Sequence, residues 1–340
     1  MTMKRLSIAE ALRECIRGEM RRDERVFCIG EDIAVRGGWG GAFTVTLGLE
    51  KEFSDRMINT PISENGFFGV ALGAAMMGLR PIADVQYADF ALLAMDQIVN
   101  QIAKMRYMSG GKLTVPVTMR APVGVTGRGA QHSQSLEPFL LPAPGIKIVC
   151  PATAYDAVGL LRSAVRCDDP VMMFEHKLLY GSKGARAESG AIDASSEIPE
   201  EDYVVPIGRA VVRREGADVT VIATLLMMHR SLQAAALLEQ EGIDVEVIDP
   251  RSLVPFDWDT VKASVVKTGR VVIVEESPKR NGVGAEIAAT LAEEMIDHLT
   301  APIKRVAAPN TPAPFAPPME EYYVPSVERI AEAVRQVTSY

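Results

Sequence analysis

The chain has 340 residues, of which 48% are hydrophobic and 24% charged, and its formal net charge is −8 at pH 7. This length exceeds one typical core and predicts two domains, whereas the acidic balance, without a dense Lys/Arg cluster, excludes a nucleic-acid-binding protein. The longest apolar run, residues 219–228, is too short to span a membrane, and four cysteines without a C-x-x-C pair predict a cytoplasmic protein without a zinc or iron–sulfur framework.

Helical and strand patterns alternate through the first half of the chain. It opens with a helical pattern over residues 1–24, in which Ser7 and Glu10 predict a capping box. Two further helical patterns occupy 89–111 and 153–170. Between them, short apolar runs predict buried strands at 25–32, 80–86, 115–122, 145–151 and 170–176. This order predicts a doubly wound, mostly parallel α/β sheet.

The pattern changes in the middle of the chain and then resumes. Residues 181–206 are rich in Gly, Ser, Ala and Glu and have no period, which is typical of an interdomain linker. The alternation then returns as strands at 218–226, 243–250, 270–276 and 302–308, with helices at 229–242, 257–269, 284–298 and 326–337. We therefore predict two doubly wound α/β domains, 1–185 and 207–340, joined by a linker at 186–206.

Glycine-rich stretches give only weak signals for a phosphate-binding site. Residues 30–43 follow a predicted strand but lack the G-x-G-x-x-G spacing that leads into a helix, and no G-x-x-x-x-G-K-[ST] motif occurs. A flexible or partner-contacting loop is the favoured interpretation there. The stretch around Gly282 is interpreted as ordinary packing at a helix start.

Two side chains are candidates for proton chemistry. Glu64 stands where a Pro-Ile-Ser turn meets an apolar run, so it is either a helix-start acid or a half-desolvated catalytic carboxylate. His132 lies on a long polar loop directly after a strand, where ligands of open α/β sheets bind. His176 also follows a strand, and a cleft position is left open for it. Because no electron sink or phosphate site is visible, the chain is expected to supply half of a shared site.

Six stretches of the chain form a recognisable series. They are "TPISENGFFGVALGAAMMGLRPI", "DQIVNQIAKMRYMSGGK", "AQHSQSLEPF", "PGIKIVCPATAYDAVGLL", "DDPVMMFEHKLLY" and "IDPRSLVPFDWDTVKASVVKTGR". In order and spacing the series resembles the beta subunits of thiamine-diphosphate-dependent 2-oxo acid dehydrogenases, a family that includes the pyruvate, branched-chain and acetoin enzymes. The resemblance implies an N-terminal pyrimidine-binding domain of the thiamine-diphosphate-binding fold and a transketolase C-terminal domain.

The resemblance also implies roles for residues. Glu64 matches the carboxylate that hydrogen-bonds the aminopyrimidine ring of thiamine diphosphate, and its apolar surroundings are expected to raise its affinity for a proton. Phe90 matches the aromatic that packs on that ring, with Ile62 and Gln86 as neighbouring contacts. His132 matches the histidine that steadies the intermediate and helps pass the acyl group to lipoamide. Backbone carbonyls of four residues match a potassium loop of some members: Val117, Ala164, Cys167 and Asp169.

No G-D-G motif, which holds the diphosphate through magnesium in this family, occurs in the sequence. The resemblance implies that an alpha subunit supplies the magnesium site in an α2β2 heterotetramer, which acts on a dihydrolipoyl acyltransferase core. The expected function is oxidative decarboxylation of pyruvate, or cleavage of acetoin, with acyl transfer to a lipoyl group. A branched-chain 2-oxo acid dehydrogenase subunit, a non-catalytic assembly subunit and a hydrolase using His132 are the alternatives.

Overall fold

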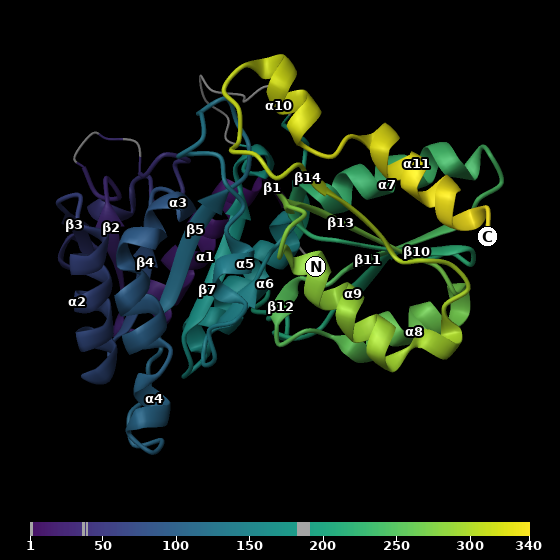
Figure 1. Cartoon of the computed structure of the whole chain (residues 1–340). Helices are drawn as coiled ribbons and strands as arrows, with labels where there is room; N and C mark the ends of the chain where they lie inside the picture. Colours follow the sequence, from purple (N-terminus) through teal and green to yellow (C-terminus); the bar gives the residue numbers. More distant parts are fainter. Residues whose placement is uncertain (1–2, 36–37, 39, 182–190) are drawn as a thin grey trace. The chain divides into compact units, whose positions relative to one another are not determined.

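The computed structural model describes residues 3–35, 38, 40–181 and 191–340. They form two compact units (Figure 1). The first unit contains residues up to 123 together with 140–207, and the second contains 124–139 together with 208–340. The segment 124–139, which carries His132, thus belongs to the second unit. The domain bounds predicted from the sequence did not anticipate this assignment, because they assume contiguous domains.

A parallel sheet forms the core of the first unit. Its strands follow the order β6-β7-β5-β4-β2-β3, and every neighbouring pair is parallel. All carboxyl ends therefore lie at one edge, which is where ligands of such sheets bind. The strands are β2 (Val26–Glu31), β3 (Met57–Thr60), β4 (Arg80–Asp84), β5 (Thr118–Val123), β6 (Lys147–Val149) and β7 (Val171–His176).

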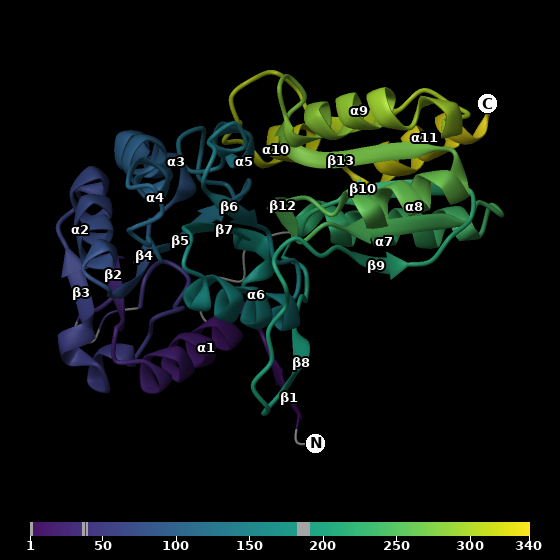
Figure 2. The ribbon, with the colours of Figure 1, turned by 90° about the horizontal axis from the view of Figure 1, so that it is seen from below.

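Helices cover both faces of this sheet. On one face, α1 (Ile8–Arg22) packs against α6 (Ala154–Arg166), and on the other lie α2 (Glu64–Met76), α3 (Ala88–Ala91) and α4 (Met105–Met108) (Figure 2). The predicted cap of the first helix is confirmed, because Ser7 and Glu10 form a capping box. A short 3-10 turn, η5 (Lys177–Leu179), follows β7.

The segment predicted to be helical at 89–111 is largely helical, but it is not one regular α-helix. The segment is α3, a 3-10 turn (Leu92–Ala94), a π-helical turn (Asp96–Ile102) and α4. Ala94, Ile98 and Ile102 are buried and are spaced four residues apart, which is also the spacing of one face of an α-helix. The sequence pattern therefore does not distinguish a regular α-helix from the π-helical turn found here.

The interdomain segment also differs from the prediction. Within it, β8 (Ser196–Pro199) pairs antiparallel with β1 (Met3–Leu6), which lies inside the stretch predicted as helix. The pairing joins residues far apart in sequence, so local composition gave no sign of it. Residues 186–190 of the predicted linker, and residues 36, 37 and 39 of the first glycine-rich stretch, lie outside the described residues.

The second unit has its own sheet, in the order β14-β13-β10-β11-β9, with only β9 antiparallel to its neighbour. In Figure 1, α7 and α11 lie on one face and α8 and α9 on the other. The prediction of two doubly wound, mostly parallel sheets is confirmed.

The strands of the second sheet are β9 (Val211–Arg214), β10 (Val219–Ala223), β11 (Val245–Asp249), β13 (Val271–Pro278) and β14 (Lys304–Ala308). The helices are α7 (Leu225–Glu239), α8 (Trp258–Thr268), α9 (Val283–Glu294) and α11 (Val327–Thr338). Three short elements are α5 (Glu137–Leu140), β12 (Ser252–Val254) and α10 (Pro317–Tyr323).

No helix in the described part of the chain is both long enough and apolar enough to cross a membrane.

Candidate active site

Two carboxyl groups meet at the carboxyl edge of the first sheet. Glu31 is the last residue of β2, and Glu64 is the first residue of α2, just after β3. Both are almost fully buried, with exposed fractions of 5% and 4%. Glu31 Oε1 accepts a hydrogen bond from the Ser63 amide at 3.2 Å. Adjacent parallel strands therefore deliver a second acid next to the one that the sequence pattern singled out.

The pKa of Glu31 is raised to about 7. Burial is the largest cause, because it disfavours the charged form, and the negative charge of Glu64 adds to it. The hydrogen bond from the Ser63 amide acts in the opposite direction. A carboxyl group with this pKa can take up and release a proton near neutral pH. Sequence reasoning missed Glu31; its place at the end of a buried strand was the available signal.

Glu64 lies at a helix start and is buried, so its position agrees with either interpretation left open by the sequence, and its catalytic role stays a prediction. It lies in the first turn of α2, and its N-cap, Ser63, makes no side-chain capping bond. Glu64 is almost fully buried as a residue, with an exposed fraction of 4%. At the end of β3, which pairs with the end of β2, the Thr60 hydroxyl is buried and has no hydrogen-bond partner among the described residues. A buried hydroxyl without a partner is unfavourable unless a ligand or water pairs with it, so this edge fits a ligand with hydrogen-bonding groups.

The other predicted cofactor contacts also lie in the first unit. Gln86 is held on both sides: its Nε2 donates to Asp84 Oδ1 at 2.7 Å, and its Oε1 accepts from the Ala42 amide at 3.1 Å. Phe90 is half-buried in α3. Ile62 is 81% exposed in the turn before α2.

A buried ionic network lies beneath this edge. Arg120 of β5 is 2% exposed and donates to Asp84 Oδ2 at 2.5 Å. It also donates two hydrogen bonds to the Glu175 carboxylate, at 2.7 and 2.6 Å, and the Tyr180 hydroxyl donates to the same group at 2.6 Å. Because Asp84 also accepts from Gln86, the network fixes the end of β4. The sequence gave no pattern for it, since its members come from three different strands and a turn.

Burial is the main cause that raises the pKa of Asp84, to about 6, and Arg120 opposes this rise. His176, for which a cleft position was left open, is buried at the end of β7, and its Nδ1 accepts from the Leu178 amide at 3.2 Å. This bond caps the following 3-10 turn.

His132 is half-buried in the loop 124–139 of the second unit. Its amide donates to the Gly129 carbonyl at 3.2 Å, and the Gly124 amide donates to the Gln134 carbonyl at 3.2 Å, so the loop folds back on itself. Gly127 and Gly129 have φ angles of 69° and 77°, which side-chain-bearing residues rarely adopt. The backbone conformation of this loop therefore depends on its glycines.

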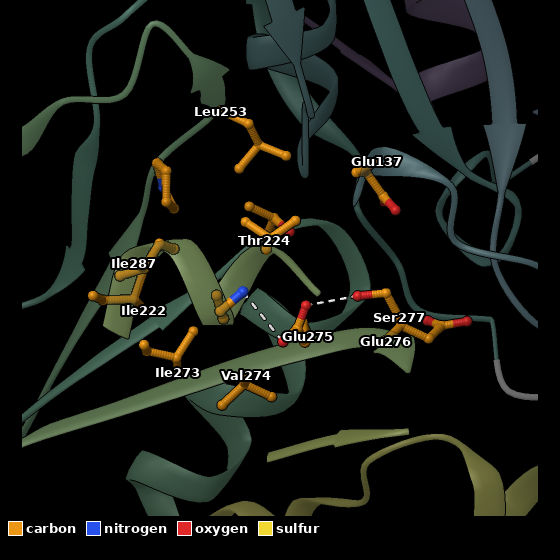
Figure 3. A pocket seen from close by; sticks show the side chains of 14 residues that line it. Glu137, Ile222, Thr224, Leu253, Ile273, Val274, Glu275, Glu276, Ser277 and Ile287 are labelled. Atoms are coloured by element: carbon orange, nitrogen blue, oxygen red, sulfur yellow. Dashed lines mark hydrogen bonds between the residues drawn. The ribbon is translucent and has the colours of Figure 1, made fainter. Parts of the chain in front are cut away.

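A small cavity in the second unit is lined by the acids Glu137, Glu275 and Glu276 (Figure 3). It offers about 30 Å³ to water-sized groups, too little for an organic cofactor. Glu275 accepts from the Ser277 hydroxyl at 2.6 Å and from the Gly284 amide at 3.2 Å. The N-terminus of α9 therefore binds a carboxylate of the chain itself, which agrees with the packing role predicted for the stretch around Gly282.

The predicted potassium loop is already rich in hydrogen bonds. Three of its four carbonyls accept one: Val117 from the Val171 amide at 3.0 Å, Ala164 from the Cys167 amide at 3.1 Å, and Cys167 from the Arg80 guanidinium at 3.0 Å. The Asp169 side chain forms ion pairs with Lys147 at 3.0 Å and with Arg106. Each carbonyl has a second lone pair, and the potassium ion stays a prediction.

Family models match both halves of the chain. The model described as "Transketolase, pyrimidine binding domain" matches residues 4–183, and "Transketolase, C-terminal domain" matches residues 208–330. Among solved structures, a split gene transketolase in an inactive beta4 tetramer has a TM-score of 0.77 at 25% identity, covering 98% of both chains. Transketolase from Leishmania mexicana has a TM-score of 0.71 at 15% identity and covers all of this chain and 46% of its own, which shows the fold alone.

Relatives of similar length have names from one group of enzymes. Acetoin:2,6-dichlorophenolindophenol oxidoreductase subunit beta of Cupriavidus necator is 45% identical over 98% of this chain and 97% of its own. The 2-oxoisovalerate dehydrogenase subunit beta and the pyruvate dehydrogenase E1 component subunit beta of Bacillus subtilis are 43% and 42% identical, each over 99% of this chain and 100% of its own. The chain therefore belongs to the family of acetoin, pyruvate and 2-oxoisovalerate dehydrogenase beta subunits, as its motifs predicted.

Proposed function

We propose that this chain is the beta subunit of a thiamine-diphosphate-dependent dehydrogenase that acts on pyruvate or acetoin together with an alpha subunit. The buried Glu64, which lies at the carboxyl edge of the pyrimidine-domain sheet near the unpaired Thr60 hydroxyl, carries this proposal. The names of relatives 42–45% identical over nearly the whole chain support it.

The residues of this chain would bind the pyrimidine part of the cofactor. When bound, thiamine diphosphate supplies the nucleophilic carbon and the electron sink for cleavage next to a carbonyl. Glu64 would hold a proton at the aminopyrimidine ring, and Phe90 and Ile62 would position that ring. The Arg120 network would keep the end of β4, and with it Gln86, in place.

The Glu31 carboxyl group would be a second proton-binding group beside Glu64. Because the pKa of Glu31 is raised to about 7 by burial and by the neighbouring charge of Glu64, the Glu31 carboxyl group would take up and release a proton near neutral pH. His132 would handle protons during transfer of the acyl group to a lipoyl group of the acyltransferase core.

An alpha subunit would complete the site with the magnesium that holds the diphosphate. The part of the chain that the structure describes contains no group of three or more His, Cys, Asp or Glu side chains suited to a metal ion. Val70 of α2 and its C-cap Met77 are 56% and 84% exposed, and a Cβ placed on Gly73 would meet nothing within 4 Å. Such an apolar, small-residue face is suited to close packing in an α2β2 heterotetramer.

Sequence identity separates the possible substrates only weakly, because the relatives named for acetoin, 2-oxoisovalerate and pyruvate are 45%, 43% and 42% identical to this chain. We place acetoin or pyruvate ahead of branched-chain 2-oxo acids. Comparing kcat/KM for acetoin, pyruvate and 2-oxoisovalerate in one reconstituted preparation, with dichlorophenolindophenol as electron acceptor, would decide among them.

Glu64→Gln in the reconstituted heterotetramer tests the proposal. We expect turnover to fall at least about 100-fold, in the range typical for removal of a general acid–base group. Glu328→Gln is the matched control, because Glu328 also lies in the first turn of a helix, α11, and should leave turnover unchanged. Undiminished turnover in Glu64→Gln would favour the non-catalytic assembly subunit, whereas ester or amide hydrolysis by the chain alone would favour the hydrolase.

A further inference from the structure

The loop that carries His132 is anchored by two acids from distant parts of the second unit. The Val125 amide donates to Glu276 Oε1 at 2.7 Å, and the Gly127 amide donates to Glu320 Oε1 at 2.8 Å. Glu276 belongs to β13 and Glu320 to α10, which are 151 and 193 residues further along the chain. Both bonds lie on the N-terminal side of His132.

The loop needs such anchors because its backbone forms no strand or helix before α5. Amides in an irregular segment must find acceptors elsewhere, and amide-to-carboxylate bonds are roughly twice as strong as neutral ones. The Phe315 ring also packs closely against the loop, since a Cβ placed on Gly129 would lie only 3.3 Å from it. Beyond His132, the side chain of Glu137 is buried, so the loop is fixed on its C-terminal side as well.

We propose that Glu320 and Glu276 are positioning residues that set the place of His132 for the reaction. The proposal rests on the proposed function, because it gives His132 a task. The proposal gives the C-terminal domain a part in positioning His132. The pyrimidine-domain family model covers His132 itself, but the side chains that hold its loop lie in β13 and α10.

Glu320 is the better residue to test, because it lies on the short, outer helix α10, where loss of a carboxylate should not prevent folding. Glu320→Ala removes the acceptor of the Gly127 amide. Glu320→Gln keeps an oxygen acceptor at the same place, so it should restore most of the anchor. Glu321→Ala is the matched control, because the adjacent exposed acid makes no hydrogen bond to the loop.

Two measurements on the complex with its alpha subunit decide the proposal. Amide hydrogen exchange of the peptide spanning 124–139 should quicken in Glu320→Ala, and in neither Glu320→Gln nor Glu321→Ala. The kcat of Glu320→Ala should fall by about 10- to 100-fold, the effect of a small displacement of a catalytic group. In a His132→Ala background, Glu320→Ala should cause no further loss, because a residue that acts through His132 is then without effect.

Unchanged exchange in Glu320→Ala, or a loss of kcat that adds in full to that of His132→Ala, would overturn the proposal. Failure of the proposed function looks different. An unmodified complex without turnover of acetoin, pyruvate or 2-oxoisovalerate would refute that function, while the exchange data would still report whether Glu320 holds the loop. Full activity of His132→Ala would refute the role of His132 and, with it, the positioning role of both acids.

Discussion

Replacing Glu31 with glutamine should change the pH dependence of stability. The pKa of Glu31 is raised from 4.5 to about 7, so the folded chain binds this proton more tightly than the unfolded chain does. Stability is therefore lost as the pH rises from 4.5 through 7. A difference of this size corresponds to roughly 3 kcal/mol at high pH, of which about 2–3 kcal/mol appears between pH 5 and pH 8.

Glutamine has no proton to lose, so Glu31→Gln should escape this loss. We expect the free energy of unfolding of the variant, relative to the unmodified chain, to rise by about 2–3 kcal/mol between pH 5 and pH 8 in urea titrations. The exposed Glu24→Gln is the control and should show no such pH-dependent gain. In a Glu64→Gln background the gain should shrink, because the charge of Glu64 is the second cause of the shift. A gain that is the same at both pH values would refute this account of the pair.

Two further substitutions test the packing beneath and beyond the site. Arg120→Met should lower the free energy of unfolding by about 3–5 kcal/mol at pH 8, because it leaves two buried carboxylates without their counter-ion. This loss of stability should diminish at low pH, where the carboxylates are protonated. A loss that does not depend on pH would contradict the ionic explanation. Gly282→Ala should destabilise the chain by about 1–3 kcal/mol, because the added Cβ would lie 2.3 Å from Glu275 Oε2. The control is Gly18→Ala in α1, where the added Cβ would meet nothing within 4 Å, and this substitution should raise the melting temperature. Equal changes of melting temperature for the two glycine substitutions would contradict the close packing of Gly282 against Glu275.

Local patterns predicted elements whose stabilising contacts are near in sequence. The capping box of Ser7 and Glu10 set the start of α1, and the short apolar runs located all the central strands. The same patterns did not distinguish the 3-10 and π-helical turns within 89–111 from a regular helix, because buried residues spaced four apart fit either. Local patterns failed for the pair β1 and β8, since two strands of four residues each form only when they pair with each other.

The sequence by itself determined the two-sheet architecture, the family and the candidacy of Glu64 and His132, because periodicity and motif spacing are properties of the chain written in one dimension. Only the tertiary structure decided that Glu31 lies beside Glu64, that Arg120 joins Asp84 to Glu175, and that Glu320 holds the loop of His132. Each of these depends on charges and hydrogen bonds between residues from different strands, helices and loops. Electrostatic energy depends on distance in space and on burial, and neither is encoded in the local pattern of any one segment.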